Sequence, residues 1–212
     1  MRTEPGSVLL FLNGELPDRA LVRRIARRCA MLVCADGGAR HARSLGLIPD
    51  AVVGDMDSLA RPLPRSWAQT FFCCDFDENA SDFDKALDFV RRTGCRRVYV
   101  AGLLGGRLDH SLVNLALARR FGARPELVIV DRGVAALLGP GRRRLRCRRG
   151  ELVSLLAANS AARVSISGVR YPLARAVLAA GSRGLSNRAL GPVTLTVHSG
   201  LVWVMAPKAV IP

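Results

Sequence analysis

The first 131 residues alternate strand-like with helix-like segments, and this alternation constrains the fold more than any other feature. Largely apolar runs at 8–12, 31–35 and 97–101 are separated by segments with helical spacing of apolar residues, such as 81–92 and 109–121. Strands that are apolar along their whole length are typical of a parallel sheet with both faces covered. The sequence therefore predicts an α/β fold in this part, with an open, mostly parallel sheet and helices on both faces.

After about residue 133, strand-like segments follow one another without intervening helices. These segments are 152–157, 163–167, 193–197 and 201–205. Residues 193–197 alternate with a period of two, which indicates a strand with one buried face. The short connection at 198–200 predicts a hairpin between the last two strands. We therefore expect a second, all-β domain, and divide the chain into a catalytic domain at 1–137 and a β domain at 138–212.

The chain is strongly basic, at +15, yet 11 of its 17 acidic residues fall between Asp36 and Asp109. All but Lys85 and Lys208 of its 32 basic residues are arginine, which fits either GC-rich coding or a nucleic-acid surface. The densest run, 142–149, has no interleaved aromatic residues for stacking on bases. We therefore do not expect nucleic acid as the main partner.

Several classes of protein do not fit the sequence. No apolar run approaches the ~20 residues that a membrane-spanning helix needs, and the first is too short for a signal peptide. The six cysteines show no CxxC spacing, which favours reduced thiols in a cytoplasmic protein over a zinc or disulfide framework. The chain also lacks the GxGxxG, GxxxxGK[ST] and GxSxG patterns of dinucleotide sites, P-loops and nucleophile elbows.

Polar residues gather directly after five of the predicted strands. They are Asn13-Gly14, Asp36-Gly37-Gly38, Asp55-Met56-Asp57, the segment 75–81 and the segment 102–110. The carboxyl ends of parallel strands share one edge of the sheet, where ligands bind. We therefore expect the functional site at this edge.

Carboxylates dominate these loops. Asp55 and Asp57 have an i, i+2 spacing, which in extended backbone turns both carboxylates to one side, where they can share a cation. A turn or helix cap would explain this motif taken alone, but Asp82 and Asp109 add carboxylates from two other loops. Oxygen ligands of this kind suit Mg²⁺ that also carries the phosphates of a substrate.

The same edge offers groups that suit a phosphate. Gly105-Gly106-Arg107 precedes a helix, so backbone N–H groups and a guanidinium could hold an anion, although an ordinary turn also uses glycine. Lys85 lies one helical turn after Asp82, and it could neutralise phosphate charge or remain a solvated helix residue. His110 fits a capping role as well as ligand binding. Ser81 is expected to cap the helix that contains Lys85.

Taken together and in order, the motifs resemble those of the thiamine pyrophosphokinase (thiamine diphosphokinase) family. The resemblance rests on residues 35–39, 49–58, 79–87 and 102–110, on Asn114 and on residues 184–187. It implies a C-terminal β-sandwich and a homodimer. It also implies transfer of a pyrophosphoryl group from ATP to the hydroxyl of thiamine, which yields thiamine diphosphate and AMP.

The resemblance also implies roles for individual residues. It assigns Mg²⁺ and the triphosphate to Asp55, Asp57, Asp82 and Asp109, with Lys85 as a further catalytic residue. It assigns ATP binding to Asn13, Asp36, Gly37, Gly38, Gly105, Gly106, Arg107, His110 and Asn114. It assigns thiamine binding to Tyr171, Ser186 and Asn187.

Three positions depart from the family's usual pattern: Ser81 replaces Thr, Met56 replaces Phe, and Tyr171 stands where some relatives have Trp. Tyr171 fits a core aromatic of the β domain as well as a ring stacked on the vitamin. Two other functions remain open from the sequence. One is a related pyrophosphokinase that acts on another alcohol, such as a hydroxymethylpterin, and the other is an Arg-rich nucleic-acid-binding protein.

Overall fold

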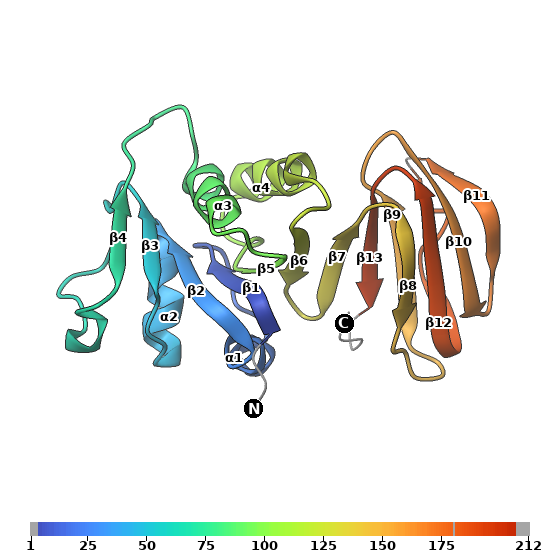
Figure 1. The fold of residues 1–212 in the computed structure, drawn as a ribbon, viewed down its shortest axis with the longest axis horizontal. Helices are drawn as coiled ribbons and strands as arrows, with labels where there is room; N and C mark the ends of the chain where they lie inside the picture. Colours follow the sequence, from blue (N-terminus) through green and yellow to red (C-terminus); the bar gives the residue numbers. More distant parts are fainter. Residues whose placement is uncertain (1–3, 180, 207–212) are drawn as a thin grey trace. The chain divides into compact units, whose positions relative to one another are not determined.

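The computed structural model describes residues 4–179 and 181–206, which form two compact units (Figure 1). One unit holds the residues up to Pro125 and the other those from Arg132 on, so that the division falls at β6 (Glu126–Val130). The predicted limits, 1–137 and 138–212, and the separate roles given to the two parts stay predictions. No helix in the described segments is both long and apolar enough to cross a membrane.

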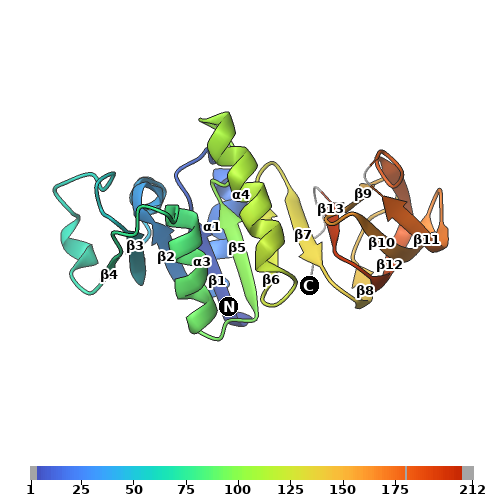
Figure 2. The same ribbon diagram turned by 90° about the horizontal axis from the view of Figure 1, so that it is seen from above.

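The first unit contains a parallel sheet in the order β5-β1-β2-β3-β4. Figures 1 and 2 show α3 and α4 over one face and α1 and α2 over the other. Its elements are β1 (Glu4–Phe11), α1 (Arg19–Ala26), β2 (Cys29–Ala35), α2 (Ala39–Leu45), β3 (Ala51–Gly54), β4 (Phe71–Cys74), α3 (Asp82–Arg92), β5 (Arg97–Ala101) and α4 (Leu108–Phe121). The predicted open α/β architecture is confirmed.

The core of this unit lies between the sheet and its helices. Along β1 the residues from Val8 to Phe11 are all buried, as the continuous apolar run predicts. On α3, Phe83, Leu87 and Val90 recur at helical spacing and are buried. Full burial of such a side chain contributes roughly 1.5–3 kcal/mol. This packing fixes α3, and with it the polar residues at its N-terminus.

The second unit is an antiparallel β-sandwich, as the resemblance implies. Its strands are β7 (Val134–Leu138), β8 (Gly141–Leu145), β9 (Leu152–Ala157), β10 (Ala161–Val169), β11 (Leu173–Ala179), β12 (Asn187–Ser199) and β13 (Val202–Ala206). One sheet has the order β7-β13-β9 and the other the order β8-β12-β10-β11. The start of the long strand β12 also pairs with β9.

The predicted hairpin at 198–200 is wrong. Between Val193 and Val197, β12 pairs with β10 on one edge and with β8 on the other, so neither edge is open to β13. β13 instead enters the other sheet, where it pairs with β7 and β9. The sequence also fails to predict β7, β8 and β11, and the three consecutive arginines of β8 make that strand look like a linker.

Candidate active site

The loops at the carboxyl edge of the first sheet are held together by backbone hydrogen bonds. The N–H of Gly14, after β1, donates to Gly102 O at 2.8 Å, and the N–H of Glu15 donates to Leu104 O at 2.8 Å, both after β5. The side chain of Asn13 lies against Gly37, where an added Cβ would be 2.5 Å from Asn13 Nδ2. The structure thus brings together three of the loops predicted to bind a nucleotide.

A group of three carboxylates lies at this edge. Among the described residues, oxygen atoms of Asp36, Asp55 and Asp57 lie within 4.8 Å of one another. Asp36 is 1% exposed, and its Oδ2 accepts a hydrogen bond from Ser58 N at 3.1 Å. Its Oδ1 is buried without a hydrogen-bond partner in the part of the chain that the structure describes. A buried carboxylate oxygen that lacks a donor is suited to a cation, so these residues fit Mg²⁺.

Asp82, the first residue of α3, belongs to the same site. A Cβ added at Gly54 would lie 2.9 Å from Asp82 Oδ1 and 2.8 Å from Asp36 Cβ, so glycine allows both aspartates to approach. Burial, together with the negative charges of Asp36 and Asp55, raises the pKa of Asp82 to about 6, while Lys85 opposes this rise. We call Asp36, Asp55, Asp57 and Asp82 the acidic cluster. Their repulsion would be relieved by a divalent cation.

The acidic cluster forms by a route that differs from the predicted one. Asp55 and Asp57 do not share an extended segment, because Met56 between them adopts a left-handed conformation with φ of 69°. The N–H of Asp57 turns back to donate to Asp55 Oδ1 at 3.1 Å. A tight turn therefore brings the two side chains together, and a strained non-glycine residue at its centre is common at functional sites.

The raised pKa of Asp82 predicts a pH dependence of stability. Because its folded pKa is about 6 against an ordinary 3.8, the folded state binds more protons than the unfolded state between these values. This carboxyl group therefore lowers the free energy of unfolding as pH rises through that window. In EDTA, Asp82→Asn should become more stable relative to the parent from pH 4 to 6.5, as urea unfolding can measure. A difference that stays constant with pH would contradict the placement of Asp82.

Asp109 is placed differently from the other predicted metal ligands. Its Oδ2 accepts a hydrogen bond from Arg107 Nη2 at 2.5 Å, and its side chain is 61% exposed. The hydrogen bonds from Arg107 lower the pKa of Asp109 to about 2. Its oxygens are not among those that lie within 4.8 Å of one another in the described residues. The structure thus pairs Asp109 with Arg107, and its role as a metal ligand stays a prediction.

Around Arg107 the chain has the features of an anion site. Gly105 and Gly106 have φ of 92° and 72°, and α4 begins directly afterwards, at Leu108. The N-cap residue Arg107 makes no side-chain cap among the described residues, but the N–H of His110 donates to Asp109 Oδ1 at 2.9 Å. The N–H groups of Leu108 and Asp109 at the start of the helix suit an anion. Asn114 Nδ2 donates to Leu103 O at 3.1 Å and so supports the loop, while His110 is exposed.

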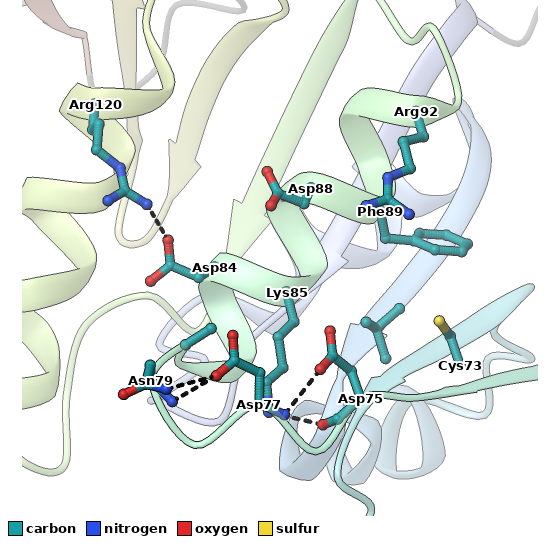
Figure 3. A pocket seen from close by; sticks show the side chains of 12 residues that line it. Cys73, Asp75, Asp77, Asn79, Asp84, Lys85, Asp88, Phe89, Arg92 and Arg120 are labelled. Carbon is teal, nitrogen blue, oxygen red and sulfur yellow. Dashed lines mark hydrogen bonds and ion pairs between the residues drawn. The ribbon is translucent and has the colours of Figure 1, made fainter.

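Lys85 lies beside a pocket of about 280 Å³ next to α3 (Figure 3). The side chain is only 7% exposed, and Nζ donates to Asp75 O at 2.8 Å. Ser81 caps α3 as predicted, since its Oγ accepts from Asp84 N at 3.2 Å. Lys85 acts electrostatically on Asp82, but its described hydrogen bond is to the loop before α3.

The residues predicted to bind thiamine lie together in the second unit. Asn187 is buried, its Oδ1 accepts from Tyr171 N at 3.0 Å, and its Nδ2 donates to Tyr171 O at 2.7 Å. Ser186 is exposed and has φ of 57°. Tyr171 is 63% exposed, so it is not a core aromatic of the sandwich. Asn187 thus fixes the backbone of this exposed residue.

Asn187→Ala should lower the free energy of unfolding by about 2 kcal/mol, because it removes the two hydrogen bonds to the backbone of Tyr171. Asn187→Asp keeps the acceptor for Tyr171 N, so its free energy of unfolding should fall less than that of Asn187→Ala. Urea unfolding of the two variants measures the difference. Equal stability of Asn187→Ala and the parent would show that the two hydrogen bonds contribute nothing net.

Sequence reasoning assigned Asp36 to the nucleotide and missed it as a candidate cation ligand. Its position directly after β2, one residue out of register with Asp55 after β3, carried the signal, because β2 and β3 are neighbouring parallel strands. It also missed the ion pair between Asp84 and Arg120, which joins α3 to α4. No pattern in the sequence indicates that pair, since its members are 36 positions apart.

The chain is similar in sequence to known proteins. Residues 22–135 match the family model of the thiamin pyrophosphokinase catalytic domain, and residues 143–202 match that of the thiamin pyrophosphokinase vitamin B1 binding domain. Thiamine pyrophosphokinase 2 of Arabidopsis thaliana is 28% identical over 137 residues, or 53% of this chain and 51% of the relative. Thiamine pyrophosphokinase 1 of Oryza sativa subsp. japonica is 29% identical over 138 residues, with the same coverage. The chain thus spans about half the length of the curated relatives it matches.

Solved structures share the fold. A thiamin pyrophosphokinase from Geobacillus thermodenitrificans has a TM-score of 0.78 at 22% identity, over 94% of this chain and 96% of the other. A thiamine pyrophosphokinase from Bacillus subtilis has a TM-score of 0.77 at 18% identity, over 94% and 98% of the two chains. Because the catalytic-domain model alone matches more than half of its residues, the chain belongs to the thiamin pyrophosphokinase family.

Proposed function

We propose that the protein transfers a pyrophosphoryl group from ATP to the hydroxyl of thiamine, with release of AMP and thiamine diphosphate. The observation that carries the proposal is the acidic cluster at the carboxyl edge of the sheet, with its unpartnered Asp36 Oδ1. Clustered carboxylates are costly in a folded protein unless they hold a cation. ATP is delivered to enzymes of this kind together with Mg²⁺, so the cluster fits the proposed substrate.

Catalysis would depend mainly on positioning and on neutralisation of charge. Asp36, Asp55 and Asp57, with Asp82 beside them, would hold Mg²⁺, which when bound would neutralise charge on the phosphate oxygens. Arg107 and the N–H groups of Leu108 and Asp109 at the start of α4 would hold terminal phosphate oxygens. The side chain of Arg107 is well exposed, so it can turn from Asp109 to a phosphate.

The other assigned residues would fix the orientation of the substrates. Asn13, Gly37 and Gly38 would border the nucleotide, together with Gly105, Gly106, His110 and Asn114. Lys85 would hold the loop before α3 and reduce the repulsion within the acidic cluster, as its effect on Asp82 supports. Asp109 would serve as a further ligand once Arg107 moves to a phosphate.

Thiamine is favoured over a hydroxymethylpterin as the acceptor. The match of residues 143–202 to a vitamin B1 binding domain supports this choice. Tyr171, held by Asn187, offers an exposed ring that could stack on the vitamin, and Ser186 offers a hydroxyl nearby in sequence. A ring of this kind also attracts the positive thiazolium group of thiamine.

We further infer a homodimer that acts in the cytoplasm. The exposed side of α4 carries Leu108, Leu112 and Leu115, which repeat at helical spacing and would suit cover by a second copy. All six cysteines are free, which fits a reducing compartment. Light scattering across a concentration series would test the dimer.

The activity is tested by incubating the purified protein with ATP, Mg²⁺ and thiamine and separating the products by chromatography. Thiamine-dependent formation of AMP together with thiamine diphosphate would support the proposal. ADP together with thiamine monophosphate would overturn pyrophosphoryl transfer, and the absence of thiamine-dependent turnover would overturn the acceptor. In the last case a hydroxymethylpterin is the next acceptor to test.

A further inference from the structure

The second unit is far more basic than the first. This unit comprises residues 126–128 and the described residues from 132 to 206. It contains twelve arginines but only two acidic residues, Glu126 and Glu151. Three of the arginines, Arg142, Arg144 and Arg163, lie on the sheet β8-β12-β10-β11, and all three are exposed. In the described part of the chain no ion pair involves any of these three.

The pairing register places Arg142 and Arg144 on one face with hydroxyl side chains. Two rows cross the sheet: Arg142, Thr196 and Ser165 form one, and Arg144, Thr194 and Ser167 form the other. Arg163 extends the same face along β10, two residues before Ser165. We call these seven residues the basic face.

The basic face points away from the core. On β12 the alternate residues Val193, Leu195 and Val197 are buried, and so are Val164 and Ile166 on β10. Side chains two residues apart share a face of a strand, so the residues between these must point outward. The two rows contain neither an aromatic nor a large apolar residue, and beside them lie His198, whose Nε2 is 2.8 Å from Ser165 Oγ, and Val177, the partner of Arg163 across the sheet. The basic face is therefore a solvent-facing surface with charged and hydroxyl donors.

We infer that the basic face binds the phosphate backbone of duplex nucleic acid without sequence preference. Arginine and hydroxyl side chains are typical donors to phosphate oxygens. Arg142 and Arg144 are about 6.8 Å apart along β8, and β8 and β10 are about 9.6 Å apart across the sheet, so the charges are spread rather than focused on one small anion. This inference does not depend on the proposed enzymatic activity.

The chemistry of the basic face favours a duplex over two other partners. Single strands are held mainly by stacking of bases on aromatic rings, which the two rows lack. Anionic membranes are typically bound by surfaces that also insert apolar side chains, and the two rows offer none. The sequence argued against nucleic acid because the arginine run 142–149 lacks aromatic residues. That absence speaks against stacking on bases, but not against contacts to phosphates.

The test measures binding of a fluorescein-labelled 20-base-pair DNA duplex by anisotropy at several salt concentrations, without ATP or Mg²⁺. The test variant carries Arg142→Gln, Arg144→Gln and Arg163→Gln. Its matched control carries Arg23→Gln, Arg24→Gln and Arg27→Gln, three exposed arginines at α1 in the other unit. Each triple variant removes three charges and so lowers the formal net charge equally, from +15.

Removal of the basic face should weaken binding at least tenfold near 0.1 M salt. It should also reduce the slope of log K against log salt by about 2.7, since each phosphate contact contributes about 0.9. The control should stay within threefold of the parent. Equal weakening of both variants would overturn the proposal, because binding would then follow total charge alone.

Two further measurements complete the test. Thermal unfolding shows whether the triple variant is folded, and if it is not, Arg142→Gln and Arg144→Gln singly should each reduce the slope by about 0.9. Vesicles with 30% phosphatidylserine provide the alternative surface. Binding to these vesicles that needs the basic face, without binding to the duplex, would overturn the proposal in favour of a membrane.

Discussion

Asp55→Asn is expected to abolish turnover while making the metal-free protein more stable. Loss of one carboxylate from the acidic cluster weakens the hold on Mg²⁺, and we expect turnover to fall on the order of 10³-fold, about 4 kcal/mol of transition-state stabilisation. The same change removes a negative charge from beside Asp36 and Asp57. In EDTA it should therefore raise the free energy of unfolding by about 1 kcal/mol.

These opposite effects distinguish a cation site from a structural role. The rise in melting temperature that Mg²⁺ gives the parent should be lost in Asp55→Asn, because binding to the folded state alone produces that rise. Asp82→Asn should behave in the same way. Glu78→Gln is the matched control, since Glu78 is exposed in the loop before α3 and outside the acidic cluster. Full activity in both Asp55→Asn and Asp82→Asn would overturn the metal assignment.

Gly38→Ala is expected to destabilise the first unit by about 3 kcal/mol, which is large for a single added methyl group. A Cβ at this position would lie 2.3 Å from Phe11 O and 2.7 Å from Phe11 C, both backbone atoms of the central strand β1. Neither atom can move without disturbing the sheet. The backbone around residue 38 would have to move instead, and this movement would shift Asp36, two residues earlier. Activity should therefore fall together with stability.

The chain offers a clean way to measure this effect. It contains two tryptophans, Trp67 in the first unit and Trp203 in the second, so in a Trp203→Phe background fluorescence reports the first unit alone. Gly38→Ala should then lower the urea midpoint by about 1.5 M for a slope near 2 kcal/mol per M. Gly191→Ala, in the second unit, adds a Cβ that meets nothing within 4 Å and should leave this midpoint unchanged, which checks that the fluorescence reports the first unit alone. A midpoint unchanged in Gly38→Ala would contradict the close approach of β1.

Much of the first unit could be predicted because its elements follow from local patterns. The continuous apolar runs became buried parallel strands, and the helical spacing of Phe83, Leu87 and Val90 became the buried side of α3. Ser81 caps that helix as its position suggested. In the second unit, by contrast, β8 was hidden by its arginines. Its strand conformation comes from pairing with β12, a contact with residues about 50 positions away.

The candidate site shows the same division. The sequence alone determined that carboxylates and glycines follow successive parallel strands, and such loops must meet at one edge of the sheet. Only the tertiary structure decided which carboxylates approach one another. It brings Asp36 to Asp55 and Asp57 and pairs Asp109 with Arg107 instead.

The physical reason is that strand and helix patterns are local, whereas side-chain proximity depends on where loops turn. The left-handed turn at Met56 brings Asp55 and Asp57 together, and Gly54 leaves room for Asp36 and Asp82. Neither feature can be predicted from the spacing of apolar residues. The basic face likewise exists only because pairing aligns β8 and β10 with β12. The sequence by itself thus determined the fold class, the family and the edge of the sheet that holds the site. The tertiary structure decided the partners of each charge.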